Sequence, residues 1–363
     1  MLSLEDLDTP SVVVDLEVLE ANVGRMAERA REARVHLRPH AKTHKIPELG
    51  RVQLAAGAAG ITVAKVGEAE VFAAAGFEDI FLAYPVVGAG KGRRLLALSD
   101  RLRLAVGADS LEGAASVGSA FHEAGRRVDV LLKVDCGYHR VGAAPERAAE
   151  TARRLAELPG IALSGVFTHA GHAYHAGTRE EVESIARAEG DVLVSAAEAI
   201  RAEGLAVTEV SVGSTPTARA AMTVGGVTEC RPGNYVYHDA SQVSLGTCAI
   251  ADCAMTVLAT VVSVPAADRA VLDCGSKTLS SDALRPHADG HGWILGRKSR
   301  LDKLSEEHGV VRVEPGETFR VGERVRVLPN HACVVSNLHD RVVLARGERV
   351  EGEWTVAARG RVR

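Results

Sequence analysis

The feature that most constrains this chain is a regular alternation of short β-branched runs with Ala/Leu/Glu/Arg-rich segments of helical periodicity. Eight runs are predicted strands: residues 11–16, 36–39, 61–65, 80–84, 102–106, 128–135, 161–168 and 207–213. Repeated β-then-α units place neighbouring strands parallel to each other. Eight such units in about 225 residues fit a barrel better than an open doubly wound sheet. We therefore expect an α/β fold built on a TIM-like (β/α)8 barrel.

The pattern changes after residue 235, where helical periodicity nearly disappears. Short Val/Thr-rich runs between Gly, Pro and Asp turns follow, and residues 254–264, 270–273, 324–327 and 341–346 are predicted strands. Residues 1–235 are expected to form the barrel, although residues 1–10 could pack against the second domain. Residues 236–363 are expected to form that separate, all-β domain.

Composition narrows the class of protein. The 363 residues are 46% apolar and 25% charged, which is typical of a globular protein. Lys and Arg number 43 against 47 Asp and Glu, so we expect neither nucleic acid nor an anionic membrane as a partner. No apolar run approaches the roughly 20 residues that span a bilayer.

The N-terminus lacks a basic and apolar secretory signal, so a cytoplasmic protein is expected. Six scattered cysteines without a C-x-x-C pair indicate reduced thiols.

The densest polar cluster, residues 38–45, comes immediately after a short apolar segment, at the end of the predicted strand 36–39. It would therefore lie at the C-terminal mouth of the barrel, where active sites of this fold are found. In an extended segment His40 and Lys42 share one face and would point into the barrel together. Burial lowers the pKa of a lysine amine, which is the state required to form Schiff bases. The same spacing also fits a solvated basic loop with Arg38 and Lys45 outside.

Residues 213–217, Gly-Ser-Thr-Pro-Thr, follow the last predicted strand and begin a short helical stretch. Small hydroxyl side chains and free backbone N–H groups bind a phosphate well, and barrels often hold one in this region. The segment also fits a helix N-cap followed by proline, and the two interpretations are compatible. In residues 231–235, Gly233 could let the backbone approach a ligand, or it could simply mark an interdomain turn.

The second domain carries a histidine and a cysteine in close spacing. His331 and Cys333 lie at i and i+2, on one face of a predicted extended segment. A thiolate with an imidazole prefers Zn²⁺ to Mg²⁺ or Ca²⁺, although a buried cysteine beside a surface histidine fits the spacing too. Residues 285–287 and His291 are interpreted as a surface loop that could reach a partner subunit's site.

Three histidines follow the predicted strand 161–168 at the same mouth of the barrel. His169 and His172 are candidate acid/base groups or ligands near neutral pH, with His175 close by. A flexible polar loop would show the same composition.

Taken together, these segments resemble the D-threonine aldolase and D-serine dehydratase family. This family is the metal-containing branch of the alanine-racemase-like (fold type III) pyridoxal-phosphate enzymes. The resemblance covers nearly the whole chain and depends on the order and spacing of several motifs. They are residues 8–11 (DTPS), 38–45 (RPHAKTHK), 133–142 (KVDCGYHRVG), 213–217 (GSTPT), 232–235 (PGNY), 273–277 (DCGSK) and 329–333 (PNHAC).

The resemblance implies that Lys42 binds pyridoxal 5′-phosphate (PLP) covalently. Further residues would contact the cofactor: His40, Arg140 and Tyr174, and, around the phosphate, Gly213, Ser214, Thr215, Gly233 and Asn234. The family's metal pair falls on His331 and Cys333. Such enzymes typically complete their sites in a homodimer, so a homodimer is expected.

The metal pair also separates the two sides of the family. The aldolases have His-x-Asp at this position and the dehydratases have His-x-Cys, and this chain has Cys333. A carboxylate suits Mg²⁺ or Mn²⁺, whereas a thiolate suits Zn²⁺. We therefore expect PLP and a divalent metal, with Zn²⁺ favoured over Mn²⁺ or Mg²⁺. The expected reaction is a D-serine dehydratase-type elimination from a β-hydroxy-D-amino acid, which gives a 2-oxo acid and ammonia.

Three other functions remain open. Retro-aldol cleavage to glycine and an aldehyde needs the same groups, with His169 or His172 as the base that takes the hydroxyl proton. An amino-acid racemase would need a second base across the cofactor and no metal. A non-catalytic PLP-binding protein would resemble the barrel but would lack the second domain.

Overall fold

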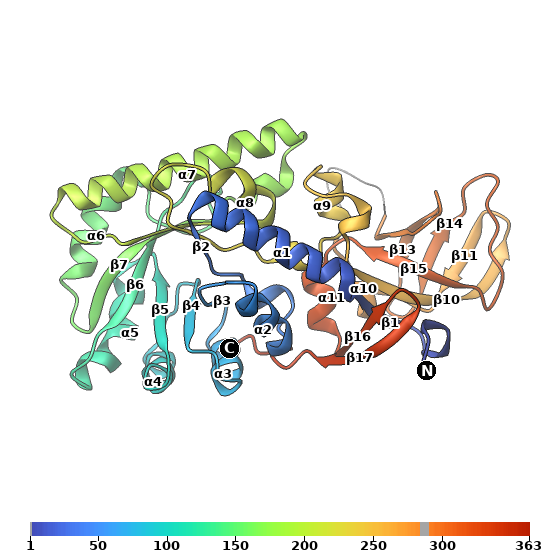
Figure 1. Cartoon of the computed structure of the whole chain (residues 1–363), viewed down its shortest axis with the longest axis horizontal. Helices are drawn as coiled ribbons and strands as arrows, with labels where there is room; N and C mark the ends of the chain where they lie inside the picture. The colour runs from blue at the N-terminus through green and yellow to red at the C-terminus, as the bar shows by residue number, and fades with distance from the viewer. Residues whose placement is uncertain (1, 284–289) are drawn as a thin grey trace.

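The computed structural model describes residues 2–283 and 290–363 and divides them between two β-sheets. Figure 1 shows an elongated molecule, with a helix-covered barrel at one end and the second sheet at the other. Residues 285–287, interpreted from the sequence as a surface loop, lie outside the described residues.

The first sheet is a barrel of eight parallel strands. Its neighbours follow the order β2-β9-β8-β7-β6-β5-β4-β3, and a parallel bridge between His40 and Thr62 joins the two ends. The strands are β2 (His36–Leu37), β3 (Ile61–Val63), β4 (Asp79–Leu82), β5 (Arg103–Ala108), β6 (Val128–Lys133), β7 (Ile161–Phe167), β8 (Glu209–Val212) and β9 (Glu229–Cys230). The predicted TIM-like barrel is confirmed.

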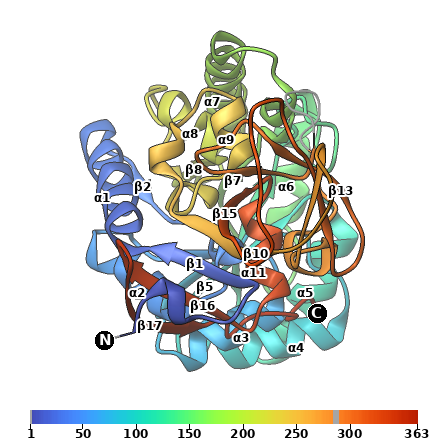
Figure 2. The same cartoon turned by 90° about the vertical axis from the view of Figure 1, so that its right-hand side faces the viewer.

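Helices cover the outside of this barrel (Figure 2). They are α1 (Leu16–Ala33), α2 (Pro47–Ala55), α3 (Val66–Ala74), α4 (Ala89–Leu98), α5 (Leu111–Glu123), α6 (Ala148–Ala156), α7 (Arg179–Ala202) and α8 (Thr215–Ala221). Local sequence determines where several begin: Asp15 accepts hydrogen bonds from the first turn of α1, and Thr178 does so for α7. Short 3₁₀ turns lie in the loops at the barrel mouth, among them η2 (Ala41–Thr43), η4 (Gly171–His175) and η5 (Asn234–Val236).

The second sheet has nine strands in the order β11-β14-β13-β12-β15-β10-β1-β16-β17 and is mostly antiparallel. The strands are β1 (Ser11–Asp15), β10 (Met255–Ala266), β11 (Arg269–Leu272), β12 (Gly292–Ile294), β13 (Arg300–Leu304), β14 (Gly309–Arg312), β15 (Arg324–Pro329), β16 (Arg341–Arg346) and β17 (Arg349–Thr355). Three short helices accompany the sheet: α9 (Ala240–Ser244), α10 (Ser276–Leu279) and α11 (Ala332–Leu338).

One predicted barrel strand was wrong. β1 pairs with β10 and β16 in the second sheet, where Val14 lies opposite Met255 and Leu344. Its three consecutive valines are fully buried, and such a run fits any strand that is covered on both faces. The eighth barrel strand is instead β9, whose two residues are too few to show a strand period.

Two further findings concern the class of protein. All six cysteines are free thiols, as expected from their spacing. Among residues 2–283 and 290–363, no helix combines the length and the apolar character needed to cross a bilayer.

Candidate active site

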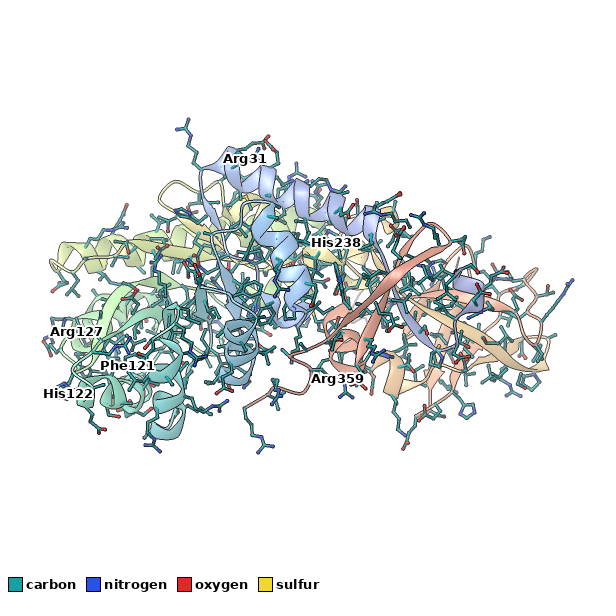
Figure 3. All side chains as sticks on the ribbon, turned by 60° about the horizontal axis from the view of Figure 1, so that its bottom comes forward. Arg31, Phe121, His122, Arg127, His238 and Arg359 are labelled. Carbon is teal, nitrogen blue, oxygen red and sulfur yellow. The ribbon has the colours of Figure 1, made fainter. Side chains whose placement is uncertain are left out.

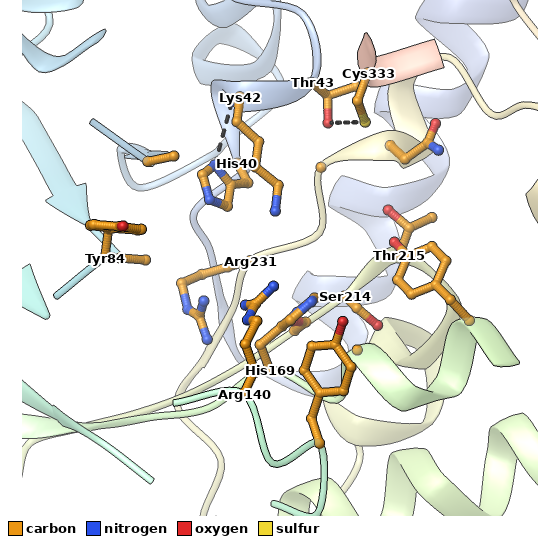
Figure 4. A pocket seen from close by; sticks show the side chains of 18 of the residues that line it. His40, Lys42, Thr43, Tyr84, Arg140, His169, Ser214, Thr215, Arg231 and Cys333 are labelled. Carbon is orange, nitrogen blue, oxygen red and sulfur yellow. Dashed lines mark hydrogen bonds between the residues drawn. The ribbon is translucent and has the colours of Figure 1, made fainter. Parts of the chain in front are cut away.

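A cavity of about 630 Å³ lies where the carboxyl ends of the barrel strands face the second domain. It is the size of a small-molecule site. Figure 4 shows the Lys42 side chain reaching into it, with Arg140, Arg231 and His169 opposite. The predicted residues that line it are His40, Lys42, Arg140, His169, Tyr174, Gly213, Ser214, Thr215, Gly233, Asn234, His331 and Cys333.

Lys42 and His40 enter the cavity in a different way from the one predicted. His40 pairs with β3, and the chain then turns into η2, so the two residues do not share an extended strand. The Nδ1 atom of His40 accepts a hydrogen bond from the Lys42 backbone N–H at 3.4 Å. Burial lowers the pKa of the Lys42 amine, and Arg140 adds to this effect. The structure therefore provides the weakly basic amine that a nucleophilic lysine needs.

The alternative of a solvated basic loop is wrong. Arg38 is buried, and its Nε atom lies 2.6 Å from Glu229 Oε2. Lys45 is buried as well, with its Nζ atom 3.2 Å from Glu68 Oε1. These pairs hold the two ends of the segment in place, so that Lys42 between them projects into the cavity.

A tight loop after β6 positions Arg140. Asp135 accepts hydrogen bonds from the backbone of Gly137 and His139, each at 3.0 Å, and contacts the His139 ring at 2.9 Å. Gly142 has a φ of +127°, and a Cβ there would lie 2.7 Å from the Asp135 nitrogen. A residue with a side chain would therefore disrupt the loop.

His169 and Tyr174 follow β7 and line the cavity. The Nδ1 atom of His169 lies 2.9 Å from the carbonyl oxygen of Gly213, so the ring donates there and leaves Nε2 as an acceptor. Burial, with repulsion from Lys42, lowers the pKa of His169 well below its usual value, so the ring is neutral at pH 7. His172 is not among the lining residues and stacks on Tyr138 at 6.3 Å.

The backbone is tightly packed where Gly213 and Gly233 line the cavity. A Cβ on Gly233 would lie 2.7 Å from Thr43 Oγ1, and one on Gly213 would lie 2.7 Å from the Arg231 nitrogen. Only glycine allows such a close approach of backbone segments. Ser214 is the N-cap of α8, as predicted, and accepts from the Thr217 N–H at 3.4 Å.

Glu189 on α7 holds this loop from behind. Its Oε1 atom accepts from the Ala170 and Gly213 N–H groups, each at 3.1 Å, and its Oε2 atom accepts from the Thr217 hydroxyl at 2.7 Å. The carboxyl group is fully buried. It thus joins the segment that carries His169 to the segment expected to hold the phosphate.

His331 and Cys333 lie at the start of α11, not on an extended strand. His331 is the residue before the helix and Cys333 is in its first turn. Both still line the cavity, because residues two apart at this boundary can face the same space. The Cys333 thiol lies 3.3 Å from the Thr43 hydroxyl and so faces the Lys42 segment (Figure 4).

This donor set fits a zinc ion that also binds water or substrate. A thiolate and an imidazole are soft and borderline ligands, and the Nδ1 atom of His331 is 2.7 Å from Asp282 Oδ2, which orients the ring. No group of three or more His, Cys, Asp or Glu side chains in the described part of the chain could hold a metal. His331 and Cys333 are therefore a pair of candidate ligands and not a complete metal site within the described residues.

Several site residues were missed by sequence reasoning. Arg231 and Lys133 are buried cations that line the cavity directly after β9 and at the end of β6. Burial lowers the pKa of Lys133 to about 7. Asp239 accepts from the Asn234 side chain and from the Ala332 N–H at 3.0 Å, which links the barrel to α11. Two sequence features could have identified them: Lys133 and Arg231 are charged residues at the end of a barrel strand or directly after one, and Asp239 lies close to the domain junction.

Known proteins share this architecture along the whole chain. Residues 14–241 match the family described as alanine racemase, N-terminal domain, and residues 254–345 match a serine dehydratase domain. The fold and the lysine-bearing cavity therefore define a PLP-dependent enzyme of the alanine-racemase-like class. The chain belongs, more narrowly, to the family of PLP-dependent lyases that includes D-threonine aldolases and D-serine dehydratases.

Three curated relatives show the range of that family. A D-threonine aldolase from Arthrobacter sp. is 36% identical and covers 98% of this chain and 94% of its own. A D-threo-3-hydroxyaspartate dehydratase from Delftia sp. (strain HT23) is 39% identical over 91% of this chain and 92% of its own. A D-serine dehydratase from Dictyostelium discoideum is 31% identical over 92% of each chain.

Solved structures agree with this assignment. A D-threonine aldolase from Filomicrobium marinum superposes with a TM-score of 0.92 at 32% identity, over 100% of this chain and 99% of that one. A D-threo-3-hydroxyaspartate dehydratase gives 0.91 at 36% identity, over 98% and 99%. That structure is a cysteine-to-alanine mutant in the metal-free form. Metal binding is thus a property of the family.

Proposed function

We propose that this protein is a PLP- and zinc-dependent lyase that eliminates water from β-hydroxy-D-amino acids, as a D-serine dehydratase does. The observation that carries the proposal is the cysteine at the metal pair. Cys333 and His331 line the same cavity as Lys42, and a thiolate favours Zn²⁺ over Mn²⁺ or Mg²⁺. The dehydratase relative crystallised as a metal-free cysteine mutant supports a link between a cysteine and the metal.

The cavity offers cations to an anionic substrate and cofactor. Lys42, Lys133, Arg140 and Arg231 line it. Asp109 and Asp239 are its only carboxylates among the described lining residues. We propose that Gly213, Ser214, Thr215, Gly233 and Asn234 bind the phosphate and that His40, Arg140 and Tyr174 contact the ring. PLP, when bound, supplies an electron-withdrawing ring that stabilises negative charge at the substrate Cα.

Lys42 is proposed to take the Cα proton. Its lowered pKa leaves a larger fraction of free amine near neutral pH than an exposed lysine has. His331 and Cys333, which line the same cavity, would hold a Zn²⁺ ion, and this ion would supply a Lewis acid for the substrate β-hydroxyl. Loss of water from D-serine followed by hydrolysis gives pyruvate and ammonia.

A second candidate is retro-aldol cleavage, and His169 favours it. Its ring is neutral, and its Nε2 atom is free to accept a proton from the substrate β-hydroxyl. Two aldolases are among the most similar proteins. His172 does not line the cavity and stacks on Tyr138, so it is less suited to act as this base. A racemase would keep its activity without metal, which separates it from both lyases.

We also propose that the site is completed in a homodimer. Tyr84 and Val141 line the cavity at its mouth and are 43% and 39% exposed. Large apolar side chains at the rim of a cavity suit coverage by another surface. Sedimentation of the purified protein as a monomer would contradict this proposal.

The proposed reaction is tested with D-serine and Zn²⁺, following pyruvate and ammonia. The expected result is equal formation of both products, loss of activity with EDTA and recovery with Zn²⁺. Cys333→Ala should lose activity but keep the visible absorbance of bound PLP, whereas Lys42→Ala should lose both. Turnover of D-serine that is unaffected by EDTA and by Cys333→Ala would refute the proposal.

A further inference from the structure

A second cavity, of about 560 Å³, lies on the other side of the loop expected to hold the PLP phosphate. It is bounded by α1, α7, α8 and residues 246–252. Thr215 lines both cavities and accepts a hydrogen bond from the Tyr235 N–H at 3.1 Å, so these two residues form part of the wall between them. This cavity is also of small-molecule size, and the proposed lyase reaction does not use it.

Five solvent-exposed arginines from three helices line this second cavity. They are Arg25 and Arg29 from α1, Arg179 and Arg187 from α7, and Arg219 from α8. Two carboxylates, Glu183 and Asp252, also line it. Five positive against two negative groups leave a surplus of three positive charges, although the whole chain has a net charge of −4. Cys248 lines the cavity as well, and its ionised form would reduce the surplus to two positive charges.

The two carboxylates are already engaged by two of the arginines. Asp252 lies 2.7 Å from Arg25, and Glu183 lies 3.3 Å from Arg179. Arg29, Arg187 and Arg219 form no ion pair or hydrogen bond with the described residues. Burial, with repulsion from Arg219 and Arg25, lowers the pKa of Arg29 below its usual value. The charges of Arg219 and Arg25 thus act on Arg29 across this cavity.

A further unpartnered group points to a ligand. His238 is partly buried, lines this cavity and lies beside the Cys248 thiol, while its buried Nδ1 atom has no hydrogen-bond partner among the described residues. Figure 3 shows His238 in the middle of the molecule, well away from Arg31 near the far end of α1. A polar ligand in the cavity is one partner that would satisfy this atom.

We infer that this second cavity is a binding site for a small phosphate-bearing anion, distinct from the PLP site. Guanidinium groups bind phosphate and carboxylate oxygens through paired N–H donors. A phosphate group has three terminal oxygens and about two negative charges, which suits three free guanidinium groups from different helices. A single carboxylate has two oxygens and one charge and would satisfy only one of them.

The test is calorimetric titration of the PLP- and zinc-loaded enzyme with inorganic phosphate at low ionic strength. Loading with PLP fills the first phosphate site, so the remaining binding reports on the second cavity. We expect saturable binding of one phosphate per chain. Arg29→Gln/Arg219→Gln should weaken it by about tenfold for each guanidinium removed. Malonate, a dicarboxylate of similar size, should bind more weakly than phosphate.

The matched control is Arg31→Gln/Arg127→Gln. It removes the same charge at two exposed positions that do not line the second cavity, and both residues lie at the periphery in Figure 3. The control should bind phosphate like the wild type, and both variants should keep wild-type circular dichroism. Unsaturable binding, equal loss in the two double variants, or malonate binding as tightly as phosphate would overturn the inference. A change of oligomeric state in Arg29→Gln/Arg219→Gln without phosphate binding by the wild type would also overturn it.

Discussion

Replacing Glu189 by alanine tests the support behind the phosphate loop. The carboxylate accepts hydrogen bonds from the N–H groups of Ala170 and Gly213. Alanine leaves both buried donors without an acceptor, at about 1–3 kcal/mol each, so we expect a loss of about 2–6 kcal/mol in the free energy of unfolding. The Thr217 hydroxyl adds little to this loss, because it can turn toward Ser214 Oγ at 2.9 Å.

Replacing Glu189 by glutamine separates the effect of the lost hydrogen bonds from the effect of the lost side-chain volume. Its carbonyl oxygen keeps the acceptor for both N–H groups, so Glu189→Gln should cost only about 1 kcal/mol. Glu198→Ala, on the exposed face of the same helix, should lie within about 0.5 kcal/mol of the wild type. Urea unfolding of the PLP-free protein, followed by circular dichroism, measures all three. Equal midpoints for Glu189→Ala and Glu198→Ala would refute the reasoning.

Four other outcomes are expected. The pKa of buried His44 is about 4, so the unfolded chain binds more protons between pH 6.5 and 4, and stability falls as pH drops. His44→Asn should remove up to about 1.4 kcal/mol per pH unit of that slope, as measured by urea unfolding at several pH values. Arg38→Met removes the cation nearest to buried Glu229, which keeps Arg231 at 4.0 Å, and should cost about 3 kcal/mol in the same assay. Cys333→Asp should shift metal content, measured by elemental analysis, from Zn²⁺ toward Mn²⁺. Lys42→Ala should abolish the visible absorbance of bound PLP in a spectrum of the purified protein.

The sequence predicted the barrel well because its signal is local and repeated. Every βα unit carries its own alternation of β-branched and helical segments, and most predicted strands lie within a few residues of the observed ones. Pairing between distant segments leaves no such signal. β1 joins strands more than 200 residues away in the second sheet, and only the three-dimensional structure shows this.

The candidate site was likewise predictable only where the sequence carries a local signal. The motifs around Lys42, Gly213 and Cys333 were found from residue types and order, and the structure brings them to one cavity. The extended conformation predicted around Lys42 and Cys333 was wrong. A two-residue spacing fits a 3₁₀ turn or the start of a helix as well as a strand. Glu189 was missed because it lies in the middle of a long helix, where a glutamate is usually a solvated surface residue.

The most direct test of the proposed reaction is a single incubation of D-threonine with the zinc-loaded enzyme, in which both products are measured together. Elimination gives 2-oxobutanoate and ammonia, whereas retro-aldol cleavage gives glycine and acetaldehyde. The cysteine at the metal pair predicts that 2-oxobutanoate predominates and that EDTA abolishes its formation. Predominant formation of glycine and acetaldehyde would contradict this account and make the protein an aldolase despite Cys333.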